Sequence, residues 1–309
     1  MHFSLSADLI KEQTRIGSGV IMRRITRILS SKSTLEGAGV KLKRVFGYDE
    51  VPLFDPFLLL DHFGSENPED YVRGFPWHPH RGIETVTYML NGEVEHGDSL
   101  GNSGVIRSGD VQWMTAGSGI IHQEMPKRYD GLMQGFQLWV NLPARKKMMA
   151  PRYRGITKDE IPALEKEGTE IKVLAGKIDG IEGPVQDLVV DVEYFDVKLA
   201  AGKVFEHPAE GSRKMLAYVF EGSGYFGDVL ITSQQCALFG EGDTFKVRTD
   251  DGLRFLLVSG KTLKEPVAWG GPIVMNSKEE LATAFKELDE GTFIKAGKTV
   301  KTSRDFYRS

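Results

Sequence analysis

The chain has 309 residues, enough for one large or two ordinary domains, since domains commonly contain about 100 to 200 residues. Its 39 lysines and arginines against 43 aspartates and glutamates leave a formal charge of −4, which gives no strong field for phosphate or anionic lipid. We therefore expect two domains and no direct contact with nucleic acid.

The apolar segments are short. The longest runs, such as residues 57–60, fall far below the roughly 18 residues needed to cross a bilayer. The opening sequence MHFSLSADLIKEQ lacks the apolar run of about 7 to 15 residues of a signal peptide. The single cysteine, Cys236, excludes an internal disulfide and is typical of a reducing compartment. We expect no membrane insertion and a cytoplasmic location, with the nucleus as the alternative in a eukaryotic cell.

Helical periodicity is confined to three segments. Residues 5–14 could form a short helix, and residues 158–166 are a second candidate in which Pro162 is badly placed. Residues 278–288 follow Asn276 and Ser277, which are good N-cap residues, and carry apolar side chains at helical spacing.

The remaining apolar segments are typical of strands. Each is short, rich in β-branched or aromatic residues, and bounded by Gly, Asn, Asp or Pro. The segments are 40–46, 83–90, 135–142, 170–176, 188–199, 215–220 and 253–260. Together with 35 glycines, which suit many tight turns, they predict an all-β protein built as sandwiches or barrels.

A weak internal repeat predicts the number of barrels. The segment VTYMLNGEVEHGD (86–98) is echoed by LAYVFEGSGYFGD (216–228), and each copy is followed by a Gly-Asp pair, at 109–110 and at 242–243. We therefore expect two tandem barrels, joined through the polar stretch 144–170. The expected parts are an extension over 1–19, a first barrel over 20–145, a linker over 146–169, and a second barrel over 170–309 that ends in a helix and a tail.

Two short segments concentrate side chains that bind metals. WHPHRG places His78 and His80 two residues apart, and HQEMP places His122 and Glu124 at the same spacing. Alternate residues of a strand share one face, so each pair can point the same way. If the two strands face one another in a barrel, three nitrogens and one oxygen converge on one ion. This donor set suits Fe(II), Mn(II), Ni(II), Co(II), Cu(II) or Zn(II), and the spacing leaves the choice open.

The neighbouring residues refine this hypothesis. Pro79 removes a backbone donor, so its strand should lie at a sheet edge or at the barrel mouth, where an ion can meet solvent. Glu84 lies four residues after His80 and would share its face on an uninterrupted strand, so it competes with Glu124 for the carboxylate role. Five protein ligands would leave little room for substrate, so we do not expect both to bind.

Other candidate side chains are less specific. Four histidines are interpreted individually as surface or satisfied core residues, namely His2, His62, His96 and His207. Four residues flank the predicted site and are candidates for an apolar pocket, with half of them expected in the core: Phe75, Trp77, Trp113 and Met114. Cys236 is expected to be a buried small hydrophobe.

Several long segments resemble the pirin family. In the first half these are FDPFLLLDHFG, WHPHRGIETVTYMLNGEVEHGDSLGN, IRSGDVQWMTAGSGIIHQEMP and GFQLWVNLP. In the second half, ALFGEGD and LKEPVAWGGPIVMNSKEEL resemble the pirin C-terminal domain, so the resemblance runs from about residue 20 to the end. It implies two cupin barrels in tandem, in agreement with the internal repeat.

The resemblance also implies a ligand set. It consists of His78, His80, His122 and Glu124 around one mononuclear iron, and it leaves Glu84 to line the core or to orient a histidine. Seven residues separate Glu84 from Gly92 where the general cupin pattern has six. In the second barrel only His207 lies near a ligand position, and we expect that barrel to be free of metal.

Two kinds of function follow from the resemblance. Some pirins are similar to quercetin 2,3-dioxygenases, which open a flavonol ring with O2, and animal pirins also act as iron-dependent transcriptional co-regulators. Our leading hypothesis is a dioxygenase in which the ion lowers the pKa of a substrate hydroxyl and Glu124 takes its proton. The alternative is a non-catalytic iron-binding redox sensor or co-regulator that acts through a protein partner. A cupin isomerase is the third hypothesis.

Overall fold

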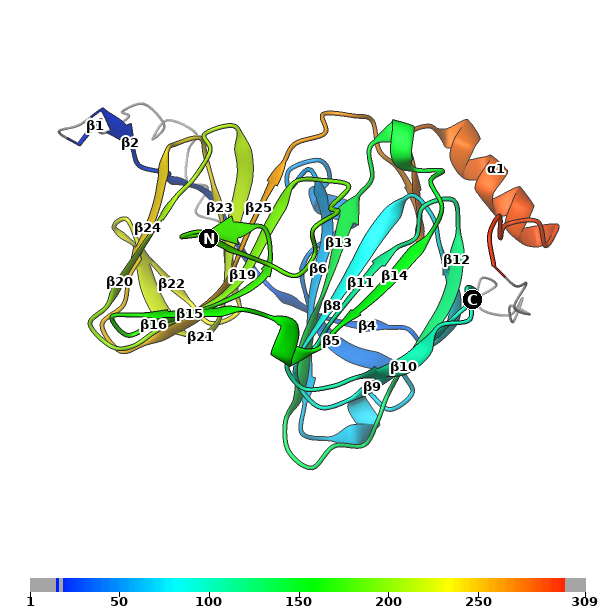
Figure 1. The fold of residues 1–309 in the computed structure, drawn as a ribbon, viewed down its shortest axis with the longest axis horizontal. Coiled ribbons are helices and arrows are strands. Elements are labelled where there is room, and N and C mark those ends of the chain that lie inside the picture. The colour runs from blue at the N-terminus through cyan, green and yellow to red at the C-terminus, as the bar shows by residue number, and fades with distance from the viewer. Residues whose placement is uncertain (1–14, 17–18, 298–309) are drawn as a thin grey trace, which may run out of the picture.

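The computed structural model describes residues 15–16 and 19–297 and contains two β-barrels side by side (Figure 1). The prediction of an all-β protein is confirmed, since strands form both barrels and the described residues contain a single α-helix. Within this described part of the chain, no helix has the length and apolarity that a membrane span requires.

The first barrel is made of a four-stranded and a seven-stranded sheet. The smaller sheet has the order β10–β9–β12–β7 and the larger has the order β14–β11–β8–β13–β6–β5–β4. The smaller contains β7 (Phe75–His80), β9 (Val94–Asp98), β10 (Ser103–Ile106) and β12 (Ile120–Pro126). The larger contains β4 (Lys32–Glu36), β5 (Val40–Phe46), β6 (Phe57–Ser65), β8 (Ile83–Asn91), β11 (Val111–Thr115), β13 (Met133–Asn141) and β14 (Arg152–Ile156). Strand β7 is at the edge of its sheet, as Pro79 predicts.

The second barrel is built from one ten-stranded sheet. Its strands are β3 (Ile25–Ser30), β15 (Ala163–Lys166), β16 (Thr169–Ala175), β19 (Val192–Leu199), β20 (Val204–Pro208), β21 (Arg213–Phe226), β22 (Val229–Thr232), β23 (Gln235–Phe239), β24 (Thr244–Arg248) and β25 (Leu253–Lys261). Three strand pairs lie outside the barrels: β1 (Arg15–Ile16) with β2 (Val20–Ile21), β17 (Lys177–Ile178) with β18 (Ile181–Glu182), and β26 (Ala268–Gly270) with β27 (Ile273–Met275). All seven strands predicted from the sequence are present, with ends shifted by a few residues.

The predicted helix near the C-terminus is confirmed as α1 (Lys278–Asp289). Ser277 caps it, because its hydroxyl accepts from the Glu280 N–H at 3.1 Å while the Glu280 carboxylate accepts from the Ser277 N–H. The helix expected over 158–166 is wrong, since Pro162 cannot continue it and the segment divides into a 3₁₀ turn and strand β15. The candidate over 5–14 lies outside the described residues. The 3₁₀ turns are η1 (Tyr48–Glu50), η2 (Pro68–Asp70), η3 (Ala144–Lys146) and η4 (Lys158–Glu160).

Two segments, one early and one late in the described part of the chain, each pack on the barrel that is more distant in the sequence. Strand β3 pairs with β23 of the second barrel, although the sequence order suggests that residues from 20 onward belong to the first. At the other end, Ile273 of β27 forms a parallel bridge with Arg81 of the first barrel, and α1 lies on the outer side of that barrel (Figure 1). Between the barrels, the chain passes from β14 to β15 around η4. Each barrel is therefore completed by a segment distant in sequence.

A continuous apolar core joins the two barrels. Buried side chains of β8 and β11, such as Tyr88 and Trp113, belong to the same cluster as Tyr194 and Tyr218 of the second barrel. Cys236 is fully buried in this cluster, as predicted. The Tyr88 hydroxyl also donates to the carboxylate of Asp196 across the boundary, at 2.7 Å. The seven-stranded wall of the first barrel is thereby held rigidly by its neighbour.

Candidate metal centre

Two strands of the four-stranded sheet bring the predicted ligands together. His78 and His80 alternate on β7, and His122 and Glu124 alternate on β12. The two strands are antiparallel neighbours, with His122 directly opposite His78. Because directly opposite residues of such a pair point to the same face, all four side chains lie on one face of the sheet.

Three imidazoles converge on one point. The ligand nitrogens of His78, His80 and His122 all lie within 4.8 Å of one another. The ring centroid of His78 lies 4.3 Å from that of His122 and 4.8 Å from that of His80. Nitrogens bound to one ion at about 2.1 Å are separated by roughly 3 to 4 Å, so little movement would be needed to grip an ion.

The hydrogen bonds of His78 and His80 fix where their lone pairs point. The Nδ1 atom of His78 lies 2.9 Å from the carbonyl oxygen of Pro76, and Nδ1 of His80 lies 3.1 Å from that of Pro272. A carbonyl oxygen only accepts, so each Nδ1 carries the hydrogen and each Nε2 carries a lone pair. Yet the two Nε2 atoms lie only 3.1 Å apart. Two facing lone pairs repel one another unless a cation sits between them, and this arrangement is suited to a metal ion.

The site also keeps its imidazoles neutral. Burial lowers the pKa of His78 to about 4 and the pKa values of His80 and His122 well below the ordinary value, and the neighbouring rings lower both further. Neutral imidazole is the form that binds metals. In addition, His122 is fully buried and neither of its ring nitrogens has a hydrogen-bond partner among the described residues. Such an orphaned group is the expected state of a ligand without its ion.

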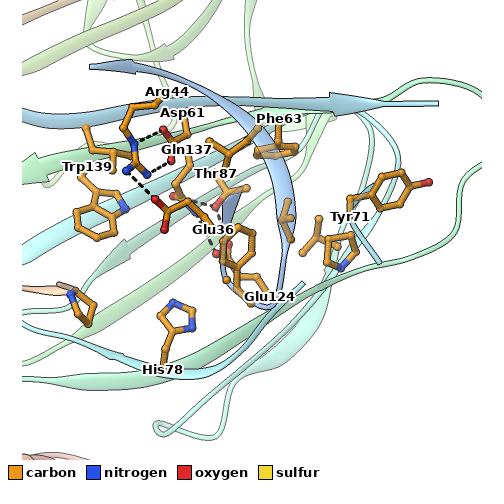
Figure 2. A pocket seen from close by; sticks show the side chains of 18 of the residues that line it. Glu36, Arg44, Asp61, Phe63, Tyr71, His78, Thr87, Glu124, Gln137 and Trp139 are labelled. Carbon is orange, nitrogen blue, oxygen red and sulfur yellow. Dashed lines mark hydrogen bonds and ion pairs between the residues drawn. The ribbon is translucent and has the colours of Figure 1, made fainter. Parts of the chain in front are cut away.

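Glu124 is buried beside the imidazoles. Its Oε1 accepts from the Thr87 hydroxyl at 2.8 Å, and its Oε2 accepts from the Gln137 amide at 3.1 Å (Figure 2). The carboxylate therefore stands next to the group of three nitrogens and not within it. Burial raises the pKa of Glu124, although the bonds from Thr87 and Gln137 oppose this effect. A carboxylate of this kind is a stronger base than an exposed one.

Glu84, the alternative carboxylate, points away from the imidazoles. Its Oε1 accepts from the hydroxyl of Thr115 on the neighbouring strand, at 2.6 Å. The even spacing from His80 fails because Gly82, with φ of +79°, turns the chain between β7 and β8. Glu84 also lies three residues before Thr87, so it faces the opposite side of β8. Its place as a metal ligand is thus excluded, and it is a core residue of the wall between the barrels.

The structure adds a histidine that sequence reasoning dismissed. His96 on β9 is buried, and its ring centroid lies 5.6 Å from that of His122. Its Nε2 lies 3.2 Å from the carboxylate of Asp98, two residues later. The signal was available, because this His-x-Asp spacing repeats the spacing of the two ligand pairs.

Two of the three imidazoles, those of His78 and His80, line a cavity of about 530 Å³ in the first barrel. Its wall is mostly apolar and includes His78, His80 and Glu124 (Figure 2). Of the four residues proposed for an apolar pocket, only Phe75 lines it. The other three, Trp77, Trp113 and Met114, pack into separate core clusters. A cavity of this size can hold a small organic molecule, since ligand pockets commonly measure about 300 to 1,000 Å³.

A charged group stands on another side of the cavity. Arg44 donates to both carboxylate oxygens of the buried Asp61, at 2.9 and 2.8 Å, and pairs with Glu36 at 2.7 Å (Figure 2). Arg44 is the one lysine or arginine among the described residues that line the cavity. Its guanidinium is already engaged by two carboxylates, so the cavity offers no free cation to an anionic ligand.

The second barrel is built differently. Its interior is filled by phenylalanines, among them Phe205, Phe245 and Phe255. His207 is buried there with its Nε2 3.5 Å from the carboxylate of Glu193. Among the described residues, the one group of three or more side chains placed to hold a metal is that of His78, His80 and His122.

Comparison with known proteins agrees with this architecture. A model of the Pirin family matches residues 39–140, and a model of the Pirin C-terminal cupin domain matches residues 194–294. A pirin-like protein of Caulobacter vibrioides is 45% identical over 274 residues, which cover 88% of this chain and 99% of that protein. A Pseudomonas aeruginosa protein, provisionally named a quercetin 2,3-dioxygenase, is 43% identical over 277 residues, 87% of this chain and 97% of its own.

A solved structure shows the same fold. The crystal structure of quercetin 2,3-dioxygenase from Acinetobacter baumannii superposes with a TM-score of 0.83 and 33% sequence identity, covering 88% of this chain and 98% of that one. Two joined cupin barrels, with converging imidazoles in the first, define a bicupin. Within that class, the chain belongs to the pirin family.

Proposed function

We propose that this protein is a metal-dependent dioxygenase that opens the ring of quercetin or a related flavonol with O2 in the cytoplasm. The observation that carries the proposal is the 3.1 Å approach of the His78 and His80 Nε2 atoms, whose lone pairs face one another on the wall of a buried cavity. His122 supplies a third nitrogen to the same group. We propose that the carboxylate of Glu124, which now accepts from Thr87 and Gln137, provides the oxygen ligand to the same ion. We assign Fe(II) as the resident ion, and these donors also suit other divalent metals.

The residues that line the cavity favour a neutral aromatic substrate. Its walls carry Phe63, Tyr71 and Trp139, which suit planar rings (Figure 2). The carboxylates of Glu36 and Glu124 can accept hydrogen bonds from phenolic hydroxyls, whereas a carboxylic acid would find the Arg44 guanidinium already occupied. A polyhydroxylated flavonol has the shape and the donors that these walls select.

Glu124 is the group that handles the proton. A divalent ion held by the imidazoles supplies the Lewis acidity that makes a nearby substrate hydroxyl easier to deprotonate. Glu124 lies on the cavity wall and its burial favours the protonated form, so it can take that proton. Thr87 and Gln137 hold the carboxylate in place while it does so. The apolar surroundings exclude water from the deprotonated ring.

The relatives support the same chemistry. The Acinetobacter baumannii structure carries the name quercetin 2,3-dioxygenase, and it shares one third of its residues and the whole two-barrel fold with this chain. The name provisionally given to the Pseudomonas aeruginosa relative states the same activity.

An anaerobic assay tests the proposal. The protein is purified without oxygen, loaded with Fe(II), and mixed with quercetin and air, and the loss of flavonol absorbance is followed together with release of carbon monoxide. We expect turnover by the wild type, loss of turnover in His122→Ala, and unchanged turnover in His207→Ala, which removes a buried histidine of the second barrel. Elemental analysis of the protein as purified identifies the resident metal. Absence of turnover with one iron per chain, across a panel of polyphenols, would contradict the enzyme and favour the iron-binding sensor with a protein partner.

A further inference from the structure

The face of the sheet that carries the imidazoles holds a third polar pair. On β9, His96 lies directly opposite Glu124 of β12, and Asp98 lies directly opposite His122. Opposite residues of antiparallel strands share a face, so His96 and Asp98 point into the barrel beside the proposed ligands. Both side chains are fully buried. A histidine and an aspartate in the interior of a barrel need a reason to be there.

His122 lacks a contact that the other two imidazoles have. The Nδ1 atoms of His78 and His80 each donate to a backbone carbonyl, which fixes ring orientation. His122 has no such partner at either nitrogen. Whichever of its nitrogens binds an ion, the other carries a buried hydrogen that needs an acceptor. Metal-binding histidines almost always donate that hydrogen to a fixed group, which orients the ring and raises its basicity.

His96 is the group placed to accept it. Its Nε2 donates to the Asp98 carboxylate at 3.2 Å, so in the neutral ring Nδ1 carries the lone pair. That Nδ1 is buried and has no partner among the described residues. The two rings that carry these unpartnered nitrogens are neighbours, with centroids 5.6 Å apart.

The neighbours of His96 hold it in one orientation. The Asp98 carboxylate accepts from the backbone N–H groups of Leu100 and Asn102, at 2.9 and 3.0 Å, and from the Asn102 amide at 2.9 Å. The ring of Tyr153 stacks on His96 with a centroid distance of 4.6 Å and an interplanar angle of 17°. The carboxylate thus sets the tautomer, and the stacking sets the plane of the ring.

We propose that His96, held by Asp98, is a positioning residue for His122. It accepts the ring hydrogen of His122 when an ion is bound. His122, His96 and Asp98 then form a chain of hydrogen bonds that leads away from the metal. The inference rests on the proposed metal centre. It gives two residues of β9 a role in metal affinity, although they are neither proposed ligands nor part of the cavity wall.

Cobalt binding tests the role without any need for turnover. Co(II) is titrated into metal-free protein in competition with a chromophoric chelator, and its visible absorption spectrum is recorded. Partners of metal-binding histidines typically contribute about 10- to 100-fold in affinity. We expect a loss of this size, with a changed Co(II) spectrum, in His96→Leu. His96→Asn keeps an acceptor near the position of Nδ1 and should retain most of the affinity.

Asp98→Asn tests the same hydrogen-bond chain at the carboxylate that accepts from His96. An asparagine keeps an oxygen for the two backbone N–H groups but donates to His96 Nε2. The ring hydrogen then moves to Nδ1, which removes the acceptor proposed for His122. We expect the same loss of Co(II) affinity as in His96→Leu. The matched control is His207→Leu, which removes a buried histidine next to a carboxylate in the second barrel and should leave Co(II) binding unchanged.

The outcomes separate this inference from the function it rests on. If the wild type binds no Co(II), or His122→Ala binds it equally well, the metal centre itself is wrong. If those two behave as expected but His96→Leu and Asp98→Asn keep the wild-type affinity and spectrum, only the positioning role is overturned. Circular dichroism checks that each variant is folded. If His96→Leu does not fold, the Co(II) affinity of Asp98→Asn alone tests the positioning role.

Discussion

The indole of Trp269 packs against the indole of Trp139, with ring centroids 5.8 Å apart, although the two residues are far apart in the sequence. Trp139 is on β13 in the wall of the first barrel, whereas Trp269 is on β26, after the second barrel. Both line the cavity, and Pro272 of the same C-terminal segment accepts the hydrogen bond from His80. The segment that follows the second barrel therefore closes the site of the first.

This closure predicts an effect of Trp269 on substrate binding. An aromatic contact contributes about 0.5 to 1.5 kcal/mol beyond its buried area, which corresponds to about a 2- to 10-fold change in affinity. We expect Trp269→Ala to raise the KM for quercetin by that factor or more, with the iron content unchanged, because the residue touches the cavity and not the ligand nitrogens. Trp269→Phe keeps a ring at the same place and should stay close to the wild type. A normal KM in Trp269→Ala would show that substrate does not reach this wall.

Lys147 is predicted to stabilise the contact between the first barrel and the segment that follows the second barrel. Its buried ammonium donates to the carbonyl oxygens of Gly82 and Val274 and to the Asn141 side chain, at 2.8, 2.9 and 2.6 Å. Lys147→Met would remove this donor from all three acceptors, although the Gly82 carbonyl keeps the Leu142 N–H at 3.2 Å. Each acceptor left unpaired costs about 1 to 3 kcal/mol. We expect the free energy of unfolding, measured by urea denaturation, to fall by about 3 kcal/mol or more.

The adjacent lysine provides the control for this measurement. Lys146 is exposed, so Lys146→Met should change the free energy of unfolding by no more than about 0.5 kcal/mol. If both variants unfold at the same urea concentration as the wild type, the three hydrogen bonds of Lys147 do not stabilise this contact.

Local sequence patterns were sufficient to find the three imidazoles, because strand alternation and antiparallel pairing act over a few residues. The same rule failed at Glu84, since Gly82 interrupts the strand. A side chain at Gly82 would place its Cβ 1.9 Å from the carbonyl oxygen of Val274, so the turn depends on a segment almost 200 residues away in the chain. No pattern within 80–84 carries that information.

Sequence patterns also could not predict that strand β3 joins the second barrel. Strand β3 has apolar residues such as Ile25 and Leu29, and these would suit the edge of either barrel. Its pairing with β23 is decided by contacts more than 200 residues apart in the sequence. By contrast, the second barrel was identified correctly, because its strand and turn signals are local. The presence of two barrels was therefore predictable, whereas the closure of the cavity was not.

His62 predicts how stability depends on pH. Its Nδ1 lies 2.9 Å from the Tyr218 hydroxyl of the second barrel, and burial, together with the nearby charge of Lys43, lowers the pKa of His62 to about 4. The unfolded chain binds this proton near pH 6.5, so stability is lost as the pH falls from about 6.5 toward 4. We expect His62→Gln, which does not titrate, to lose about 2 kcal/mol less than the wild type between pH 7 and pH 4.5 in urea denaturation. Parallel curves for the two proteins would mean that His62 titrates normally when folded.

The two buried glutamates of the first barrel offer the sharpest test of the site. Glu124 faces the cavity and Glu84 faces the core between the barrels, yet both are buried carboxylates that accept a threonine hydroxyl. Glu124→Gln preserves shape but cannot take a proton, and general bases typically contribute about 100- to 10,000-fold to rate. We therefore expect turnover per bound iron to fall by at least about 100-fold in Glu124→Gln, whereas Glu84→Gln should keep turnover within about 3-fold of the wild type. Iron per chain is measured for each variant, because Glu124 is also a proposed ligand. Loss of turnover in Glu84→Gln with normal turnover in Glu124→Gln would reverse the assignment of the two carboxylates.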